Sequence, residues 1–233
     1  MVVQAAEITC PRCSARSISK HGTTANAKQR YRCRACGRQF ITRYSYQGRD
    51  PTVCRLVVPL ALNGCGVRDI ARVLTISPTT VLKLLRQQAA RVRRSPLPAR
   101  FVELELDEMW SFVGDKAHQT WLWYAFEPRS RQIVAWQIGR RTDKTCARLL
   151  RQLAPCHVLR FCTDDWESYQ KLIPEAHHWV GKQWTQRIER QNLNFRTHLK
   201  RLHRRTICFS KNEKMHAAVI KLYIEQHNRQ HQI

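Results

Sequence analysis

The sequence has few acidic residues and no long hydrophobic run, and both absences restrict what kind of protein it encodes. Only 17 Asp and Glu residues stand against 41 Lys and Arg residues among 233, so the formal net charge is +24. An excess of this size, spread along the whole chain, favours nucleic acid as the partner because each neutralised phosphate releases counterions. No run approaches about 18 apolar residues, so neither a membrane-spanning helix nor a membrane partner is expected.

Targeting signals, repeats and several common catalytic motifs are missing as well. The first residues, MVVQAAEITCPRC, lack the apolar core of a signal peptide, so we expect the protein in the cytoplasm or on the nucleoid. In that compartment the ten cysteines are expected to be thiols or metal ligands, not disulfides. The sequence shows no glycine-rich phosphate loop, no Ser/His/Asp set and no low-complexity segment.

Two Cys-x-x-Cys pairs, CPRC and CRAC, form the first informative motif. They have C-x2-C-x19-C-x2-C spacing and supply Cys10, Cys13, Cys33 and Cys36. Two such turns folded together place four thiolates around a tetrahedral Zn²⁺, so we expect a structural zinc ribbon over residues 1–48. A redox site is the alternative for a single pair, but two pairs at this spacing disfavour it. Whether the ribbon contacts DNA or another protein stays open.

A helix-turn-helix pattern follows over residues 49–92. A helical stretch at residues 52–62 is followed by a short helix at 67–74, a turn, and a longer helix with Ser77 as N-cap and Pro78 at its first position. The residues expected to point inward are Ile70, Val73, Leu74, Val81, Leu84 and Leu85. The candidate DNA contacts on the outer face are Thr79, Thr80, Lys83, Arg86 and Gln87. An ordinary pair of packed helices is the alternative interpretation.

Residues 93–100 combine basic residues with two prolines, so we expect them to link these parts to a further domain, residues 101–233. That domain is predicted to contain three strands in hairpin order and then strands separated by helices. Its last helix is expected to begin at Ser210, with Ser210 and Glu213 in capping-box spacing. This order predicts an α/β fold in which a mixed sheet is flanked by helices, as in ribonuclease H-like proteins.

Three acidic residues lie where such a fold could bring them together. Asp107 ends an alternating strand pattern, Asp164 follows the apolar run VLRFC, and Glu189 lies on a long helical stretch. Converging carboxylates repel one another unless cations lie between them, and oxygen ligands of this kind suit Mg²⁺ or Mn²⁺. Each acid taken alone also has an ordinary explanation, as a strand end, a helix cap or a surface ion-pair partner.

The order of these motifs, with LDEMW, TDDW and TQRIERQNLNFR, resembles the DDE transposases of the insertion-sequence-one family over nearly the whole chain. The resemblance implies a ribonuclease H-like domain with two-metal phosphodiester chemistry, in which Asp107, Asp164 and Glu189 hold a pair of Mg²⁺ or Mn²⁺ ions. Asp165 stands where the family commonly has glycine, so either neighbouring aspartate could be the inward ligand.

The resemblance therefore implies a DNA transposase that binds the terminal repeats of its own element, cleaves them and joins them to target DNA. Helical spacing places Asn192 and Arg196 beside Glu189, where an amide and a cation could hold DNA phosphate. We expect double-stranded DNA as the partner and a homo-oligomer in the synaptic complex. The alternative is a non-catalytic DNA-binding regulator with a degenerate sheet domain.

Overall fold

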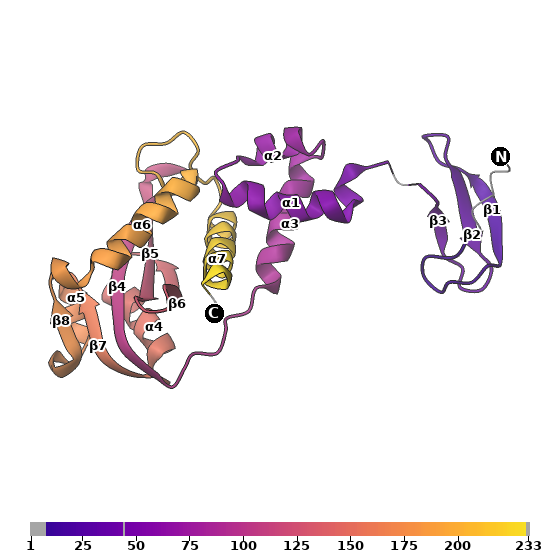
Figure 1. The fold of residues 1–233 in the computed structure, drawn as a ribbon. Coiled ribbons are helices and arrows are strands. Elements are labelled where there is room, and N and C mark those ends of the chain that lie inside the picture. The colour runs from indigo at the N-terminus through magenta and orange to yellow at the C-terminus, as the bar shows by residue number, and fades with distance from the viewer. Residues whose placement is uncertain (1–7, 44, 232–233) are drawn as a thin grey trace. The chain divides into compact units, whose positions relative to one another are not determined.

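The computed structural model describes residues 8–43 and 45–231 (Figure 1). The chain forms two compact units, Met1–Asp50 and Pro51–Ile233, which are described separately here. None of the helices in the described part of the chain has both the length and the hydrophobicity needed to cross a bilayer.

The first unit is a small antiparallel sheet in the order β1-β2-β3. Its strands are β1 (Ile18–Thr23), β2 (Gln29–Cys33) and β3 (Gln39–Ile41), and a 3₁₀ turn, η1 (Gln47–Arg49), follows. Its buried hydrophobic side chains are Cys10, Cys33 and Phe40. Because so small a core stabilises little, the unit needs another source of stability, such as a bound metal.

The second unit is built on a five-stranded mixed sheet in the order β6-β5-β4-β7-β8. Antiparallel pairing joins its first three strands, whereas β7 lies parallel to β4 and β8 lies parallel to β7. The strands are β4 (Arg100–Val113), β5 (Asp115–Glu127), β6 (Gln132–Gly139), β7 (His157–Thr163) and β8 (His178–Val180). This architecture confirms the predicted α/β fold with a mixed sheet.

The central strand β4 sends alternate side chains into two different cores. Leu104 and Leu106 are fully buried with Trp123 on one face, which α4 (Asp143–Leu153) and α5 (Glu167–Leu172) cover. Met109 is buried on the other face beneath α6 (Gln186–His198) and α7 (Glu213–Gln230). In Figure 1, α6 crosses the sheet beside β4. Both faces of the strand are therefore covered, which explains its high apolar content.

Three helices precede the sheet and belong to the same unit. They are α1 (Pro51–Leu62), α2 (Val67–Val73) and α3 (Pro78–Arg91), and α3 begins as predicted, because Ser77 Oγ accepts a hydrogen bond from Thr80 N at 3.1 Å. Side chains from all three helices share one hydrophobic core with α7. Residues 92–98, which lead to β4, have no regular secondary structure.

Two expectations about these helices are wrong. Val73 is 63% exposed instead of inward, because α2 ends at that residue and Ile76 in the following turn fills the core position. The last helix begins at Glu213 and is capped by Asn212, whose Oδ1 accepts from Met215 N at 3.1 Å. Ser210 is instead held outside the helix, where its carbonyl accepts from Gly114 N at 2.8 Å.

The helix that carries Glu189 is also shorter than expected. It ends at His198, and the extended backbone of Leu199 separates it from short η4 (Lys200–Leu202). Two further 3₁₀ turns, η2 (Glu175–His177) and η3 (Lys182–Trp184), flank β8 and lead into α6. These turns bring the first residues of α6 back to the central strand, because Ile188 N donates to Glu105 Oε2 at 2.7 Å.

Candidate active site

The three predicted acids come from neighbouring elements. Asp107 is half-buried on β4, and Asp164 is half-buried directly after β7, the parallel neighbour of β4. Glu189 is exposed in the first turn of α6. The charge of Asp164 acts on Asp107, and the charge of Glu189 acts on Asp164. The fold therefore brings all three carboxylates into one electrostatic neighbourhood.

Asp107 is held in place by side chains from the sheet and the helix. Its Oδ1 accepts from Glu108 N at 2.7 Å, and its Oδ2 accepts from the Asn192 amide. Tyr124 OH donates in turn to Asn192 Oδ1 at 2.8 Å. Burial, reinforced by the nearby charge of Glu108, raises the pKa of Asp107 to about 7. The Asn192 amide is thus engaged in positioning the acid as well as lying beside Glu189.

The structure distinguishes the two adjacent aspartates. Asp164 Oδ1 is buried without a hydrogen-bond partner among the described residues, whereas Asp165 is exposed and accepts from the Gln170 amide. Burial raises the pKa of Asp164, and the positive charge of Arg141 opposes that shift. A buried, unpaired carboxylate oxygen costs free energy unless something binds it, and a cation would do so. Asp164 is therefore the inward residue of the pair.

Two further buried acids flank Asp107, and the sequence analysis gave them no role. Glu105 receives the α6 hydrogen bond from Ile188, and burial raises its pKa to about 6. Glu108 accepts from Tyr169 OH at 2.9 Å and pairs with Arg141 at 2.7 Å, and burial raises its pKa too. The sequence did contain a signal for these two buried acids, because acidic residues stand among apolar ones along this strand. A strand with that pattern is buried on both faces.

Arg141 connects that network to the site. Its guanidinium carbon lies 5.0 Å from the ring centroid of Trp121 and 4.6 Å from that of Trp166. These cation–π contacts and the ion pair with Glu108 hold the positive charge of Arg141 close to Asp164. On the α6 side, Arg196 is half-buried, its charge acts on Asp107, and burial lowers its pKa. The acids therefore lie between two cations that can reduce their mutual repulsion.

The predicted zinc ligands meet as expected. The ligand sulfurs of Cys10, Cys13, Cys33 and Cys36 all lie within 4.8 Å of one another, and two of the pairs, Cys10–Cys36 and Cys13–Cys33, are 3.6 Å apart. Tetrahedral Zn–S bonds of about 2.3 Å imply sulfur separations of about 3.8 Å, so the cluster fits zinc. Within residues 8–43 and 45–231 no other such group is found, so Asp107, Asp164 and Glu189 do not form a cluster of comparable spacing in this structure.

The outer face of the helix-turn-helix presents most of the predicted DNA contacts to solvent. Thr79, Lys83, Arg86 and Gln87 are exposed on α3, while Thr80 is half-buried beside the N-cap Ser77. Buried Val81 and Leu85 lie on the opposite side of the helix, as predicted. This face is therefore available to a ligand without loss of the packing against α7.

Comparisons with known proteins give matches along nearly the whole chain. Residues 100–230 match the family described as IS1 transposase. Residues 44–88 match the InsA C-terminal domain, and residues 4–37 match the InsA N-terminal domain. The matches to these three families follow one another along this polypeptide in the order predicted for ribbon, helix-turn-helix and sheet domain.

Relatives named InsB resemble the second part of the chain. The insertion element iso-IS1n protein InsB of Shigella dysenteriae is 50% identical over 123 residues, which are 53% of this chain and 94% of the relative. The IS1 9 protein InsB of Escherichia coli K12 is 41% identical over 145 residues, 62% of this chain and 87% of the relative. A solved structure is also similar, a chain in the cryoEM structure of the simian T-cell lymphotropic virus intasome with PP2A regulatory subunit B56 gamma. The similarity covers 72% of this chain and 66% of that one, with 16% identity and a TM-score of 0.38. It is too distant to bear on function.

The raised pKa of Asp107 predicts a pH-dependent gain in stability for Asp107→Asn in metal-free protein. The folded-state pKa of Asp107, about 7, exceeds the usual 3.8. The protonated acid therefore makes its whole contribution to the free energy of unfolding below about pH 4, and this contribution is lost as the pH rises through 7. The free energy of unfolding of Asp107→Asn, relative to the parent, should therefore increase by on the order of 2 kcal/mol between pH 5 and pH 8. Denaturant titrations measure this difference.

Asp165→Asn is the comparison variant, because it removes the same charge from an exposed side chain. In the parent, added Mg²⁺ should stabilise the protein more at pH 8 than at pH 6, because carboxylate ligands must be deprotonated. An Asp107→Asn gain that is the same at every pH would contradict the raised pKa.

Proposed function

The chain belongs to the IS1 transposase family, and on that basis we propose that it cuts DNA at the ends of its own insertion sequence and joins them to target DNA. The observation that carries this proposal is the neighbourhood formed by Asp107, Asp164 and Glu189, with one buried carboxylate oxygen left unpaired. Carboxyl groups with perturbed pKa values that gather in one place are typical of functional sites. Related InsB proteins support a transposase.

Asp107, Asp164 and Glu189 would hold a pair of divalent cations, Mg²⁺ or Mn²⁺. When bound, such ions activate the attacking oxygen and stabilise the leaving oxygen at phosphorus. Asn192 and Tyr124 fix the orientation of Asp107 through the hydrogen bonds described above. Because Glu189 is exposed, the site opens to solvent at the α6 side, where a DNA strand can reach it.

The proposed reaction is an in-line displacement that occurs twice. Water attacks a phosphorus atom at the end of the element, and the bond to the bridging 3′ oxygen breaks to leave a free 3′-hydroxyl. That hydroxyl then attacks a phosphorus atom of target DNA and displaces a second 3′ oxygen. Arg196 lies on the same face of α6 as Glu189 and is proposed to hold DNA phosphate during both steps.

The remaining regions are proposed to hold DNA and to assemble the complex. We assign residues 1–48 to a zinc-binding ribbon, 49–92 to recognition of the element's ends, and 101–233 to catalysis, with 93–100 as the linker. The formal net charge of +24 supports a polyanionic partner and association with the nucleoid. Joining both ends of one element to a target requires that the two ends be held together, which a homo-oligomer achieves.

A direct experiment tests this function. The purified protein is incubated with a linear duplex that contains an element end, with Mg²⁺ or with a chelator. Strand breaks at the end of the element are expected only with the metal. Binding without cleavage under all metal conditions would favour the non-catalytic regulator.

End recognition should depend on the exposed face of α3. Replacing Lys83 and Arg86 together by alanine is expected to weaken binding to the element's ends, because two cations exposed to solvent are removed. The slope of log affinity against log salt should fall by about one for each lost phosphate contact. Equilibrium binding over a salt series measures both changes.

A control with the same change in net charge is available on α4, where Arg148 and Arg151 are exposed. Their double alanine variant should bind the ends with nearly the parent's affinity. If the α3 variant keeps the parent's affinity and salt slope, recognition lies elsewhere, and the ribbon becomes the leading candidate.

A further inference from the structure

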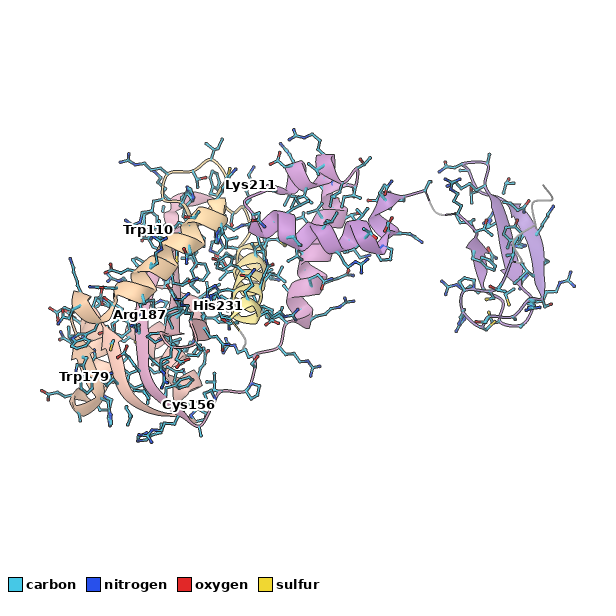
Figure 2. The ribbon with its side chains drawn as sticks, viewed as in Figure 1. Trp110, Cys156, Trp179, Arg187, Lys211 and His231 are labelled. Carbon is cyan, nitrogen blue, oxygen red and sulfur yellow. The ribbon has the colours of Figure 1, made fainter. Side chains whose placement is uncertain are left out.

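A basic cleft of about 1080 Å³ lies within the second unit, between α6, α7 and the turn that joins β5 to β6. Arg129 and Arg131 from that turn line it, together with Arg187 and Arg190 from α6. Among the residues that the structure describes, no Asp or Glu side chain lines it. Figure 2 labels Arg187 on α6 and His231 just beyond the end of α7, which both belong to the lining.

The basic cleft is separate from the candidate active site. None of the three predicted catalytic acids lines it. At about 100° per residue, Arg187 and Gln191 lie on the side of α6 opposite to Glu189 and Arg196, and Arg190 lies about 100° around the helix from Glu189. One helix therefore presents catalytic side chains on one face and residues of the cleft on another.

The positive charges in the basic cleft are largely uncompensated by the protein. In the described part of the chain, Arg129, Arg131 and Arg190 form no ion pair, and Arg187 approaches Glu103 only to 3.8 Å. Cations gathered in a concave site raise the local positive potential and attract anions. An anionic ligand would offset their mutual repulsion.

A second observation points to a ligand in the same place. Gln191 lines the basic cleft and is 3% exposed, yet its Nε2 has no hydrogen-bond partner among the described residues. Its Oε1 accepts from Asn194 Nδ2 at 3.2 Å, and its amide acts on the pKa of Tyr223, so the side chain lies beside another residue of the lining.

We propose that the basic cleft binds the phosphodiester backbone of duplex DNA, as a contact distinct from the helix-turn-helix. Guanidinium and amide donors that the protein's own carboxylates leave largely uncompensated match phosphate oxygens. Of the rings that line the cleft, Tyr223 is 6% and His227 is 9% exposed, so its accessible groups are mainly guanidinium, amide and imidazole groups, which contact phosphate without reading base identity. Recognition there is therefore independent of sequence.

This assignment rests on the proposed function in one respect, that the natural ligand is DNA handled by a transposase. Because the cleft lies on the far side of α6 from the acids, it would hold a stretch of duplex other than the phosphate undergoing reaction. The contribution of the cleft to DNA affinity should therefore be measurable with duplex DNA that lacks element ends. Such DNA offers no specific sequence for the exposed face of α3 to recognise.

The test compares full-length Arg129→Ala/Arg190→Ala with the parent on duplex DNA without element ends, at several salt concentrations and without divalent metal. Affinity should fall about tenfold near physiological salt, and the log–log salt slope should fall by about two. Arg148→Ala/Arg151→Ala has the same net charge and should change neither value. Arg129→Lys/Arg190→Lys should restore most of the slope, because the charges remain.

Inorganic phosphate and a mononucleotide are tested as separate ligands. The comparison is how strongly millimolar phosphate competes with DNA in the parent and in Arg129→Ala/Arg190→Ala. If it competes equally in both proteins, the competition does not involve the cleft arginines, and the cleft is not a DNA site. The proposal is also overturned if the Arg129/Arg190 variant keeps the parent's affinity, or if the α4 control loses as much. Because no readout uses cleavage, a parent that fails to cut element ends would refute the proposed function and leave this result intact.

Discussion

Changing any one of Asp107, Asp164 or Glu189 to its amide is expected to abolish cleavage and strand transfer together, with losses of roughly 10³-fold or more. Each change preserves the shape of the side chain and removes the charge that would bind a cation. Both steps are affected because both are proposed to use the same pair of ions. Gel assays of nicked and joined products on element-end duplexes measure the two activities.

Binding to the element's ends should survive these substitutions, because the exposed face of α3 is separate from the acids. It should tighten slightly as repulsion between carboxylate and phosphate is relieved. This separation of binding from chemistry distinguishes a catalytic role from a structural one. A variant that lost both activities and end binding would indicate misfolding, which thermal unfolding would reveal.

Asp165→Asn is the internal control for the second acid. It is exposed and accepts from the Gln170 amide, whereas Asp164 Oδ1 is buried and has no hydrogen-bond partner in the described part of the chain. Asp165→Asn should therefore keep activity. If it is inactive while Asp164→Asn is active, the two roles are exchanged and the centre remains. If Glu189→Gln cuts and joins DNA at the parent's rate, the three-carboxylate centre is wrong.

Removing zinc should produce the largest structural effect. Four thiolates whose sulfurs lie within 4.8 Å of one another repel strongly without a cation, and the first unit has few buried hydrophobic residues. Binding of Zn²⁺ to such ribbons contributes on the order of 10 kcal/mol, so chelation or Cys33→Ser should unfold residues 8–41. Metal analysis should give about one zinc ion per parent chain.

The second unit should remain folded in the same experiment, because it forms its own compact body from Pro51 onward. Limited proteolysis should then release the N-terminal segment and leave the remainder intact. Cys208→Ser is the matched control, since Cys208 is exposed and lies outside the cluster. Well-folded protein without zinc would refute the metal site.

Local patterns in the sequence were sufficient for several parts of this protein. Four cysteines at a fixed spacing predicted their own cluster, because each Cys-x-x-Cys turn places two sulfurs on one side. Ser77 and Pro78 predicted the start of α3 because capping depends on adjacent residues. The alternation along residues 101–110 predicted a strand, because the side-chain period of a strand is fixed.

Other features depended on segments far apart in the chain. Asp164 and Asp165 are equivalent in sequence, and only the packing after β7 turns the first one inward. Asn192 meets Asp107 across 85 positions, and Glu105 meets Ile188 across 83. The structural roles of Glu105 and Asn192 were therefore not evident from the local pattern.

The two helix errors and the basic cleft have the same origin. Val73 fits a helical stripe, but α2 ends there and Ile76 occupies the core; Ser210 fits a capping box, but Asn212 caps α7. The four arginines of the cleft come from a turn near residue 130 and from α6. Local chemistry determines where an element can form and which metals its side chains suit, whereas the packing of distant segments decides which side chains meet and which charges remain unpaired.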